Sequence, residues 1–472
     1  MIYAPKPYQQ LAYRFLLNRF TAPDLSPRGA GLLLDPGLGK TSITLWTYQT
    51  LRDFGEVRQG LIVAPLRVCR SVWPAETKKW GFDVKIQPLL GTAPQRRRAL
   101  AEPADLYVIN PEGLAWLATQ NLDTANAPKF DVLILDESTK FKNWGTKRHK
   151  HLRKLLPRFS HRLILTGTPS PNGLGDLFAQ VYTLDDGMTL GKSRNYFNAR
   201  YMTKGGFKGR VWSFDESQTE KLHEAISPMV LRLSAEEHLD MPELVDNVIR
   251  VQLPGDVMKE YRRLERELFM ELAGGVELTA SSAGAMYSIC KGIANGGAYY
   301  GPDKQPAFVH DTKVEALADL LEELNGKNLL VAYAFKHDLE RIQQHSAFKK
   351  APVVAGGVSA DETDRIVGEW NEGRHRALLV QPQAMSHGLN MQQGGADVAW
   401  FGLTDQLEVY QQFNARLYRQ GQEHHQVRIH HIIAEETVDE AIYARLHEKA
   451  GVQQSLLEAL DNYRKSKETL FT

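Results

Sequence analysis

The sequence predicts an α/β protein built from two parallel sheets, each flanked by helices. Its 472 residues exceed the size at which a single hydrophobic core usually stops growing, so two domains of about 200 residues are expected. Short apolar runs alternate with helical patterns in the first half of the chain, and the same alternation restarts in the second half. Buried strands that alternate with helices form parallel sheets covered on both faces.

The expected strands follow in order along each half. In the first half the apolar runs lie at residues 32–34, 61–64, 106–109, 132–135 and 163–165, and in the second half at 329–333, 377–380, 398–401 and 427–429. Between residues 194 and 310 the pattern changes to helical stretches and stretches rich in Gly, Ala and Ser. We therefore expect a first lobe over 1–235 with a helical protrusion near 190–235, a linker and helical insertion over 236–310, and a second lobe over 311–472.

The composition argues against a membrane protein, a disulfide-bonded protein and a secreted protein. No apolar run approaches the ~20 residues needed to cross a bilayer, so a membrane partner is not expected. The two cysteines, Cys69 and Cys290, are too few for a disulfide framework or a cysteine zinc site. The first residues lack the pattern of a secretory signal, which predicts a cytoplasmic protein, in the host cytoplasm if it is viral. Because the formal net charge is only +1, a surface for nucleic acid must be local.

A glycine-rich segment follows the first expected strand and precedes a helical pattern. It runs Asp35-Pro36-Gly37-Leu38-Gly39-Lys40-Thr41. Glycines let the backbone curl so that its N–H groups face phosphate oxygens, and the helix N-terminus adds a positive field. Lys40 would then reach the β- and γ-phosphates of a nucleotide, and Thr41 would hold Mg²⁺. The first glycine of the usual P-loop pattern is absent, because Leu34 occupies its position.

Carboxylates and hydroxyls follow two later strands of the same half. Asp136 and Glu137 end the run 132–135, where Asp136 can hold Mg²⁺ and Glu137 can polarise the attacking water. Thr166-Gly167-Thr168-Pro169 follows the run 163–165. Its hydroxyls could relay between the nucleotide and the rest of the lobe, or the segment could be an ordinary turn between a strand and a helix. Since the carboxyl ends of parallel strands share one edge, these residues are expected near the glycine-rich segment.

The second half offers cations but no glycine-rich loop of its own. Gln412, Arg416 and Arg419 are spaced to lie along one face of a helix. In a lobe without a phosphate loop, such arginines are expected to complete the site of the other lobe and to stabilise charge on the transferring phosphoryl group.

Other polar clusters carry weaker expectations. A basic stretch over residues 147–158 could follow nucleic-acid phosphates, although a solvated helix face is the more ordinary explanation, and Arg96–Arg98 is interpreted in the same way. His424-His425 and His430-His431 are not expected to bind zinc, because no cysteine is near and adjacent strand residues point to opposite faces.

Taken together and in this order, the segments resemble the superfamily-two helicase-type ATPases, and within them the Swi/Snf family of DNA translocases. Asp35 to Thr41 resembles the family's "DEMGLGKT", which also lacks the first glycine, and Asp136-Glu137 resembles its "DEGH", with Ser138-Thr139 in place of Gly-His. Pro7-Tyr8-Gln9 resembles the adenine-reading Q motif of the family. Two segments resemble those that contact the DNA backbone: residues 62–66 followed by Val72-Trp73 and Glu76, and residues 108–112. The other matches are residues 165–169 with Asn172 to "LTGTPxxN", Ser386–Asn390 to "GGLGINL", Gln412–Gln422 to "QAxxRxxRxGQ", and residues 437–440 to "TIEE".

The resemblance covers nearly the whole chain and implies two RecA-like lobes with helical insertions between the lobe cores. It implies ATP as substrate and magnesium as cofactor, with Gln9 at the adenine, Gly37, Gly39, Lys40 and Thr41 at the phosphates, and Gly388, Asn390 and Gln412 contributing from the second lobe. Opening and closing of the lobes would drive movement on DNA, which would be double-stranded or branched.

Two alternatives stay open at the level of sequence. A strand-separating helicase in replication, recombination or repair would use the same core, but it would need a wedge that the sequence does not reveal. A nucleotide-gated nucleic-acid-binding protein is less favoured, because Lys40, Asp136, Glu137, Arg416 and Arg419 are all present. A recruiting protein is possible but is not identified by any motif.

Overall fold

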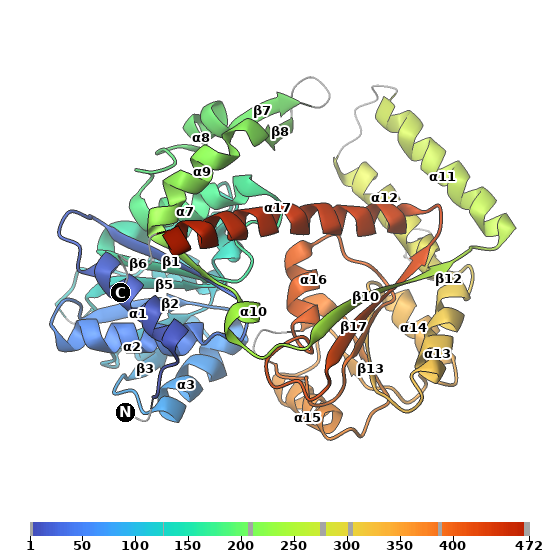
Figure 1. Ribbon diagram of the computed structural model, residues 1–472, viewed down its shortest axis with the longest axis horizontal. Helices are drawn as coiled ribbons and strands as arrows, with labels where there is room; N and C mark the ends of the chain where they lie inside the picture. The colour runs from blue at the N-terminus through green and yellow to red at the C-terminus, as the bar shows by residue number, and fades with distance from the viewer. Residues whose placement is uncertain are drawn as a thin grey trace. The chain divides into compact units, whose positions relative to one another are not determined.

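A computed structural model describes residues 3–125, 127–205, 211–273, 280–300, 305–385 and 389–466 (Figure 1). The chain divides into two compact units, one formed by Met1–Leu239 with Lys449–Thr472 and the other by Asp240–Glu448. Each unit contains one parallel sheet flanked by helices, which confirms the predicted fold class. The domain boundaries expected from the sequence stay predictions.

The sheet of the first unit has seven parallel strands in the order β3-β4-β2-β5-β6-β1-β9. The strands are β1 (Arg28–Leu34), β2 (Gln59–Val63), β3 (Ile86–Pro88), β4 (Leu106–Ile109), β5 (Phe130–Asp136), β6 (His161–Thr166) and β9 (Val230–Leu233). Every expected apolar run of this half is therefore a strand. The edge strands β3 and β9 were not predicted.

Ten helices and one hairpin accompany this sheet in the described residues. They are α1 (Pro7–Phe20), α2 (Lys40–Asp53), α3 (Trp73–Trp80), α4 (Ala93–Ala101), α5 (Leu114–Leu117), α6 (Lys147–Leu155), α7 (Leu177–Asp185), α8 (Arg194–Tyr201), the hairpin of β7 (Met202–Gly205) and β8 (Val211–Phe214), α9 (Thr219–Ile226) and α10 (Ala235–His238). Packing against the sheet is close, since a Cβ added at Gly29 in β1 would lie 2.3 Å from the carbonyl oxygen of Leu184 in α7.

The sheet of the second unit has six parallel strands in the order β10-β17-β16-β13-β15-β14. They are β10 (Glu243–Val251), β13 (Leu329–Ala332), β14 (Val353–Val354), β15 (Ala377–Val380), β16 (Asp397–Trp400) and β17 (Gln426–Ala434). Its other elements are α11 (Gly255–Ala273), α12 (Ala280–Asn295), the hairpin of β11 (Gly297–Tyr300) and β12 (Gln305–Phe308), α13 (Thr312–Glu323), α14 (Lys336–Gln344), α15 (Ala360–Asn371) and α16 (Leu407–Asn414). The four apolar runs expected in this half are the buried centres of β13, β15, β16 and β17.

The last helix, α17 (Val438–Ser466), begins in the second unit and ends in the first. Its buried Leu456, Leu457 and Leu460 belong to the same hydrophobic cluster as residues of β2, β4 and β5. Near its end, Lys465 donates to Glu237 over 2.7 Å. The core of the first unit is therefore completed by residues that lie more than two hundred positions further along the chain.

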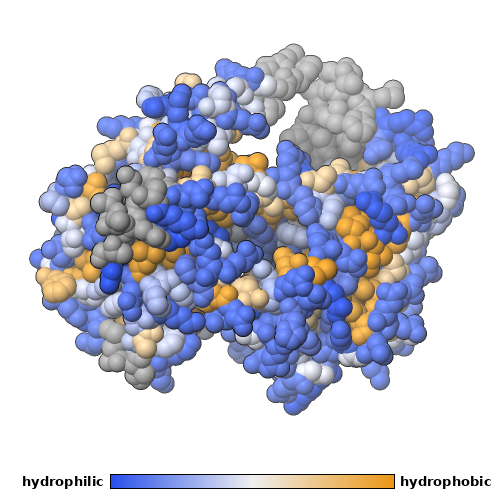
Figure 2. Space-filling view, in the orientation of Figure 1, coloured by the Kyte–Doolittle hydropathy of each residue, from blue (hydrophilic) through white to orange (hydrophobic). Residues whose placement is uncertain are grey.

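The visible face of each unit is mostly hydrophilic, with smaller hydrophobic patches (Figure 2). Large exposed hydrophobic residues such as Phe54, Leu66 and Met188 come from separate segments of the chain. Among the described residues, no helix combines the length and the apolar character that crossing a bilayer requires.

Candidate nucleotide-binding site

The glycine-rich segment forms a tight loop between β1 and α2. Gly37 and Gly39 have φ values of 91° and 81°, a conformation that residues with a side chain rarely adopt. Gly39 is the N-cap of α2, so the first turn of this helix points its free N–H groups toward the loop. A loop of this shape at a helix N-terminus is suited to hold phosphate oxygens. These positions agree with the phosphate-loop interpretation of the sequence.

Lys40 is the first residue of α2 and bends back over the loop. Its Nζ donates to the carbonyl of Leu34 over 2.7 Å and to that of Asp35 over 3.4 Å. These acceptors are uncharged, so a phosphate would be a stronger partner for the ammonium group. Thr41 follows on the next position of the helix, and its hydroxyl has no hydrogen bond to the rest of the described chain.

Gln9 packs directly against the loop from α1. Its Nε2 donates to the carbonyl of Leu38 over 3.3 Å, and its Oε1 accepts from the backbone N–H of Lys6 over 2.9 Å. A Cβ at Gly39 would lie 2.5 Å from the Gln9 amide nitrogen, so the Gln9 side chain lies close against the loop. The neighbouring Tyr8 stacks on His238 with ring centroids 5.0 Å apart. The structure therefore brings the predicted adenine-reading residue to the phosphate loop.

The loop is also held from β9 by a buried arginine. Arg232 donates to both carboxylate oxygens of Asp35, over 2.6 and 2.8 Å, and to the carbonyls of Leu33 and Leu233. Asp35 in turn accepts from the backbone N–H of Ala235 over 2.9 Å. A two-bond contact between arginine and carboxylate fixes geometry as well as charge. Arg232 thus fixes the first residue of the glycine-rich segment.

Asp136 and Glu137 lie at the carboxyl end of β5, as predicted. Asp136 is buried, and its Oδ2 accepts a hydrogen bond from the indole N–H of Trp73 over 3.0 Å. Glu137 has a φ of 58°, which is uncommon for a residue with a side chain and occurs often at functional sites. Trp73 follows a π-helical turn over Val68–Val72, another irregularity that is frequent at functional sites.

The charged side chains of the glycine-rich loop and of the end of β5 influence one another's pKa values. Burial raises the pKa of the Asp136 carboxyl to about 7, and the charge of Glu137 adds to this effect, whereas Lys40 opposes it. Burial likewise lowers the pKa of the Lys40 ammonium, although the charges of Glu137 and Asp136 oppose the shift. Each of these groups changes the pKa of another, so the glycine-rich loop and the end of β5 belong to one site.

A buried side chain joins the loops that follow β5 and β6. Ser138 Oγ donates to Gln180 Oε1 over 2.6 Å, and Gln180 Nε2 donates to the carbonyl of Pro169 over 2.7 Å. Both Ser138 and Gln180 are fully buried. Ser138-Thr139 stands where the resemblance expected Gly-His, and in this chain Gln180 from α7 connects the two loops. Within the second loop, Thr166 Oγ1 accepts from the N–H of Thr168 over 3.0 Å.

In the second unit, the predicted residues gather around the segment after β15. Arg416 Nη1 donates to the carbonyl of Leu389 over 3.2 Å, and Arg419 Nη1 donates to Asn390 Oδ1 over 2.5 Å. Gln412 lies one turn earlier and donates to Glu408 over 3.5 Å along α16. Gly388 lies outside the described residues.

The helix expected over Gln412–Arg419 is a wrong prediction. α16 ends at Asn414, and Arg416 and Arg419 lie in the turns that follow. The Asn414 side chain accepts from the indole of Trp400 over 2.9 Å, and the chain then closes shorter turns, with Arg416 N donating to the carbonyl of Phe413. α16 therefore ends before the two arginines that the spacing placed on it.

Three contributors to the site were missed from the sequence. Arg232 interrupts the apolar run Val230–Leu233, and a buried arginine must be paired, so the interruption was the available signal. Gln180 likewise lies between the apolar residues Ala179 and Val181 of α7. Trp73 was placed in a segment that resembles a DNA-backbone contact, whereas its ring is buried and its N–H donates to Asp136.

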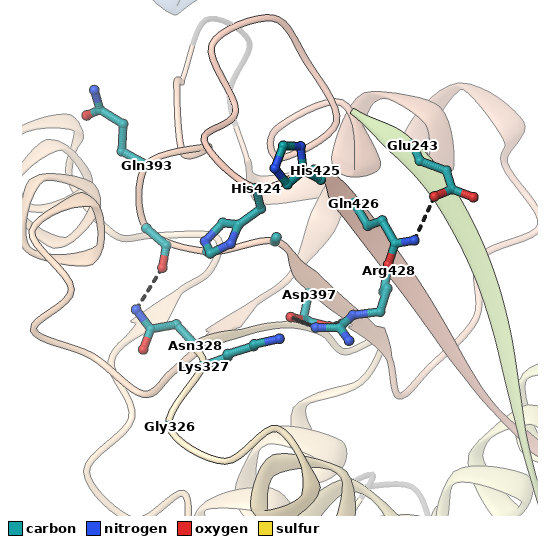
Figure 3. A pocket seen from close by; sticks show the side chains of 13 residues that line it. Glu243, Gly326, Lys327, Asn328, Gln393, Asp397, His424, His425, Gln426 and Arg428 are labelled. Carbon is teal, nitrogen blue, oxygen red and sulfur yellow. Dashed lines mark hydrogen bonds and ion pairs between the residues drawn. The ribbon is translucent and has the colours of Figure 1, made fainter. Parts of the chain in front are cut away.

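A separate pocket of about 550 Å³ lies in the second unit, at the amino ends of β10, β16 and β17 (Figure 3). Arg428 and the buried Asp397 pair through two hydrogen bonds, and Gln426 donates to Glu243 over 2.6 Å. Ligands of parallel sheets bind at the carboxyl ends of the strands, and this pocket is at the opposite edge. We therefore assign no part of the nucleotide site to it.

The residues present fit a nucleotide with Mg²⁺. The described residues hold no group of three His, Cys, Asp or Glu side chains that could bind a metal alone. Mg²⁺ in nucleotide sites commonly takes one or two protein ligands together with phosphate oxygens and waters. The Thr41 hydroxyl and the Asp136 carboxylate, with the phosphate loop between β1 and α2, provide that donor set.

Comparison with known proteins shows the family of the chain. The SNF2-related domain family matches residues 8–292, and the helicase conserved C-terminal domain family matches residues 312–421. The chain is 36% identical to the putative protein p41 of Acyrthosiphon pisum secondary endosymbiont phage 1, over 97% of this chain and 99% of that protein.

A more distant curated relative is a larger protein. The chain is 25% identical to the chromatin structure-remodeling complex subunit snf21 of Schizosaccharomyces pombe, over 91% of this chain but 38% of that protein. A solved structure, the Sulfolobus solfataricus SWI2/SNF2 ATPase core in complex with dsDNA, aligns over 98% of this chain with 19% identity and a TM-score of 0.44. The two family matches follow one another along most of the sequence, and the chain belongs to the SNF2-related family of helicase-type ATPases.

Proposed function

We propose that the protein is a DNA-dependent ATPase that moves along double-stranded DNA, as Swi/Snf-type translocases do. The observation that carries the proposal is the glycine-rich loop with Lys40 at the N-terminus of α2, together with Asp136 and Glu137 at the carboxyl end of β5 in the same sheet. Family membership supports ATP as the substrate. The names of relatives such as the mouse DNA annealing helicase and endonuclease ZRANB3 support DNA as the partner.

Each predicted residue has a role in this proposal. Gln9 reads the adenine, while Gly37, Gly39 and Lys40 bind the phosphates. Thr41 and Asp136 hold Mg²⁺, which when bound neutralises phosphate charge. Glu137 orients and polarises the attacking water. Arg416 and Arg419, supported by Asn390, Gln412 and Gly388, stabilise negative charge on the transferring phosphoryl group.

Substitutions at three positions separate these roles. Lys40→Ala should lower ATP turnover by at least about 100-fold, because a preorganised cation on the phosphates is lost. Glu137→Gln should keep ATP binding but stop hydrolysis, and Arg416→Ala should reduce hydrolysis more than nucleotide affinity. Lys350→Ala, at an exposed lysine of the second unit, is the control. Turnover of Lys40→Ala at the level of this control would disprove the site.

DNA dependence and movement need a separate experiment. ATP turnover is compared without DNA and with duplex, single-stranded and branched DNA, and displacement of a third strand from a triplex is measured beside separation of a duplex. Stimulation by duplex DNA with triplex displacement and intact duplex strands supports translocation. Strand separation would instead establish the alternative, a helicase. ATP-dependent DNA binding without turnover would establish a nucleotide-gated binding protein.

A further inference from the structure

The basic residues of the stretch 147–158 differ in how they are held by the fold. Four of them are engaged in the fold. Arg148 Nη2 donates to Glu112 Oε1 over 2.7 Å, and Arg158 pairs with Asp123 over 2.8 Å. The buried ring of His149 contacts the carbonyl of Ala179 over 3.3 Å. The Arg153 guanidinium lies 3.8 Å from the Trp144 ring centroid.

Three lysines of α6 form the other group. Lys147, Lys150 and Lys154 are exposed, and none has an acidic partner or a side-chain hydrogen bond within the described part of the chain. Their spacing of three and four residues places them on one side of the helix, over a rise of about 10 Å. We call these three residues the lysine face.

The lysine face is unfavourable for the stability of α6 itself. Like charges at spacings of three and four residues destabilise a helix by about 0.2–0.5 kcal/mol per pair. Lys147 also lies in the first turn, where the helix dipole disfavours a cation. No acidic side chain of the described residues offsets these effects. A bound polyanion would relieve both of them.

The position of α6 is fixed relative to the edge of the sheet where the site lies. Glu112, in the loop after β4, accepts from Asn110 Nδ2 over 2.8 Å through one carboxylate oxygen and from Arg148 through the other. The same helix begins shortly after Asp136 and Glu137, following a short turn over Ser138–Phe141. One carboxylate thus links the carboxyl end of β4 to α6.

We propose that the lysine face of α6 binds the phosphate backbone of DNA, an inference that rests on the proposed function. The chain has 57 Lys and Arg against 56 Asp and Glu, so attraction for a polyanion must come from places where cations lack acidic neighbours. The lysine face is such a place. Its side chains carry point charges without a fixed fork geometry, which suits contacts to phosphates rather than to bases.

The test measures how DNA binding depends on salt. The triple variant Lys147→Gln, Lys150→Gln, Lys154→Gln is compared with Lys327→Gln, Lys349→Gln, Lys350→Gln, which removes the same charge from exposed lysines of the second unit. Binding of a labelled duplex is followed by fluorescence anisotropy between about 50 and 200 mM salt. Each lost phosphate contact should reduce the slope of log K against log salt by about 0.9, so the first variant should lose up to about 2.7.

Charge is separated from folding by a third variant in which the three lysines of α6 become arginines. Wild-type slope and affinity in this variant, with a reduced slope only in the first variant, support the proposal. If the salt slope of DNA binding is the same in the first variant and in the second-unit control, the proposal is wrong. The lysine face would then be a candidate surface for an acidic protein instead. If wild-type protein fails to bind duplex DNA at all, the proposed function fails as well.

Discussion

At the scale of single residues, the carboxylate of Asp136 is oriented by the side chain of Trp73, a contact that the sequence did not reveal. The Trp73 ring is completely buried, and its N–H reaches the carboxylate over 3.0 Å. Trp73 stands at the start of α3, in the segment that resembles a DNA-backbone contact, so one hydrogen bond connects that segment to the predicted metal ligand. Such a bond restricts the rotamer of Asp136 before any ligand binds.

Replacing Trp73 with Phe should therefore weaken magnesium binding while keeping a ring in the core. A hydrogen bond to a charged acceptor contributes about 1.5–3 kcal/mol, so the Mg²⁺ concentration for half-maximal ATP turnover should rise at least severalfold. Trp80→Phe is the matched control, because the N–H of Trp80 donates to Glu76 on the surface of α3. The same Mg²⁺ requirement in both variants would exclude an orienting role for Trp73.

The contact between Ser138 and Gln180 makes a second residue-scale prediction. In a double-mutant cycle of Ser138→Ala and Gln180→Met, the unfolding free energies should show a coupling of about 0.5–1.5 kcal/mol, as expected for neighbours in one network. A cycle of Ser138→Ala with Thr183→Ala is the control, because the Thr183 hydroxyl bonds within α7. Additive effects in the first cycle would show that the two side chains are not coupled in solution.

The sequence was informative for residues whose role follows from their neighbours in the chain. Lys40 follows an apolar strand and two glycines, and Asp136 ends an apolar strand, so local patterns located both. Arg232 could not be assigned in this way, since its partner Asp35 is 197 residues away. Only the folded sheet, in which β9 pairs with β1, brings these two residues together.

At the scale of elements, buried strands were predicted more reliably than helix ends. Continuous apolar runs located the central strands of both sheets, because strands covered on both faces need apolar side chains at every position. The short edge strand β3 has no such run. The end of α16 at Asn414 is marked by neither Gly nor Pro, so no local pattern reveals it.

The buried histidine of α6 gives a prediction about pH. Burial lowers the pKa of His149 to about 4, below its ordinary value near 6.5. Between these values the unfolded chain binds a proton that the folded chain excludes, so the unfolding free energy should fall as pH falls. Between pH 7 and pH 5 the loss due to this residue should be about 2 kcal/mol.

Urea unfolding at the two pH values measures this effect. His149→Gln should remove most of the additional loss, because the glutamine amide does not titrate. The same substitution at the partly exposed His151, two positions along α6, is the control. If the pH dependence of His149→Gln equals that of wild type, the histidine is not responsible for it.

At the scale of the whole molecule, α17 gives the first unit part of its core. Leu456 is fully buried in that cluster, whereas Val452, one turn earlier on the same helix, is exposed. Leu456→Ala should destabilise the first unit by about 2–5 kcal/mol, since a large buried side chain is lost and a cavity remains.

Differential scanning calorimetry with ATP-binding measurements checks this prediction. The unfolding temperature of the first unit should fall by several degrees in Leu456→Ala and remain close to wild type in Val452→Ala. Equal unfolding temperatures in the two variants would mean that the end of α17 does not pack into the first unit in solution.

The return of α17 to the first unit also has a consequence for synthesis on the ribosome. Residues 1–239 emerge well before Leu456, Leu457 and Leu460, which complete their core. At about 5–20 residues per second, translation of the intervening stretch lasts on the order of tens of seconds. During that interval the nascent first unit exposes the apolar surface that those leucines later cover. Premature termination within the second unit would then leave a first unit with an incomplete core, which is a substrate for proteolysis.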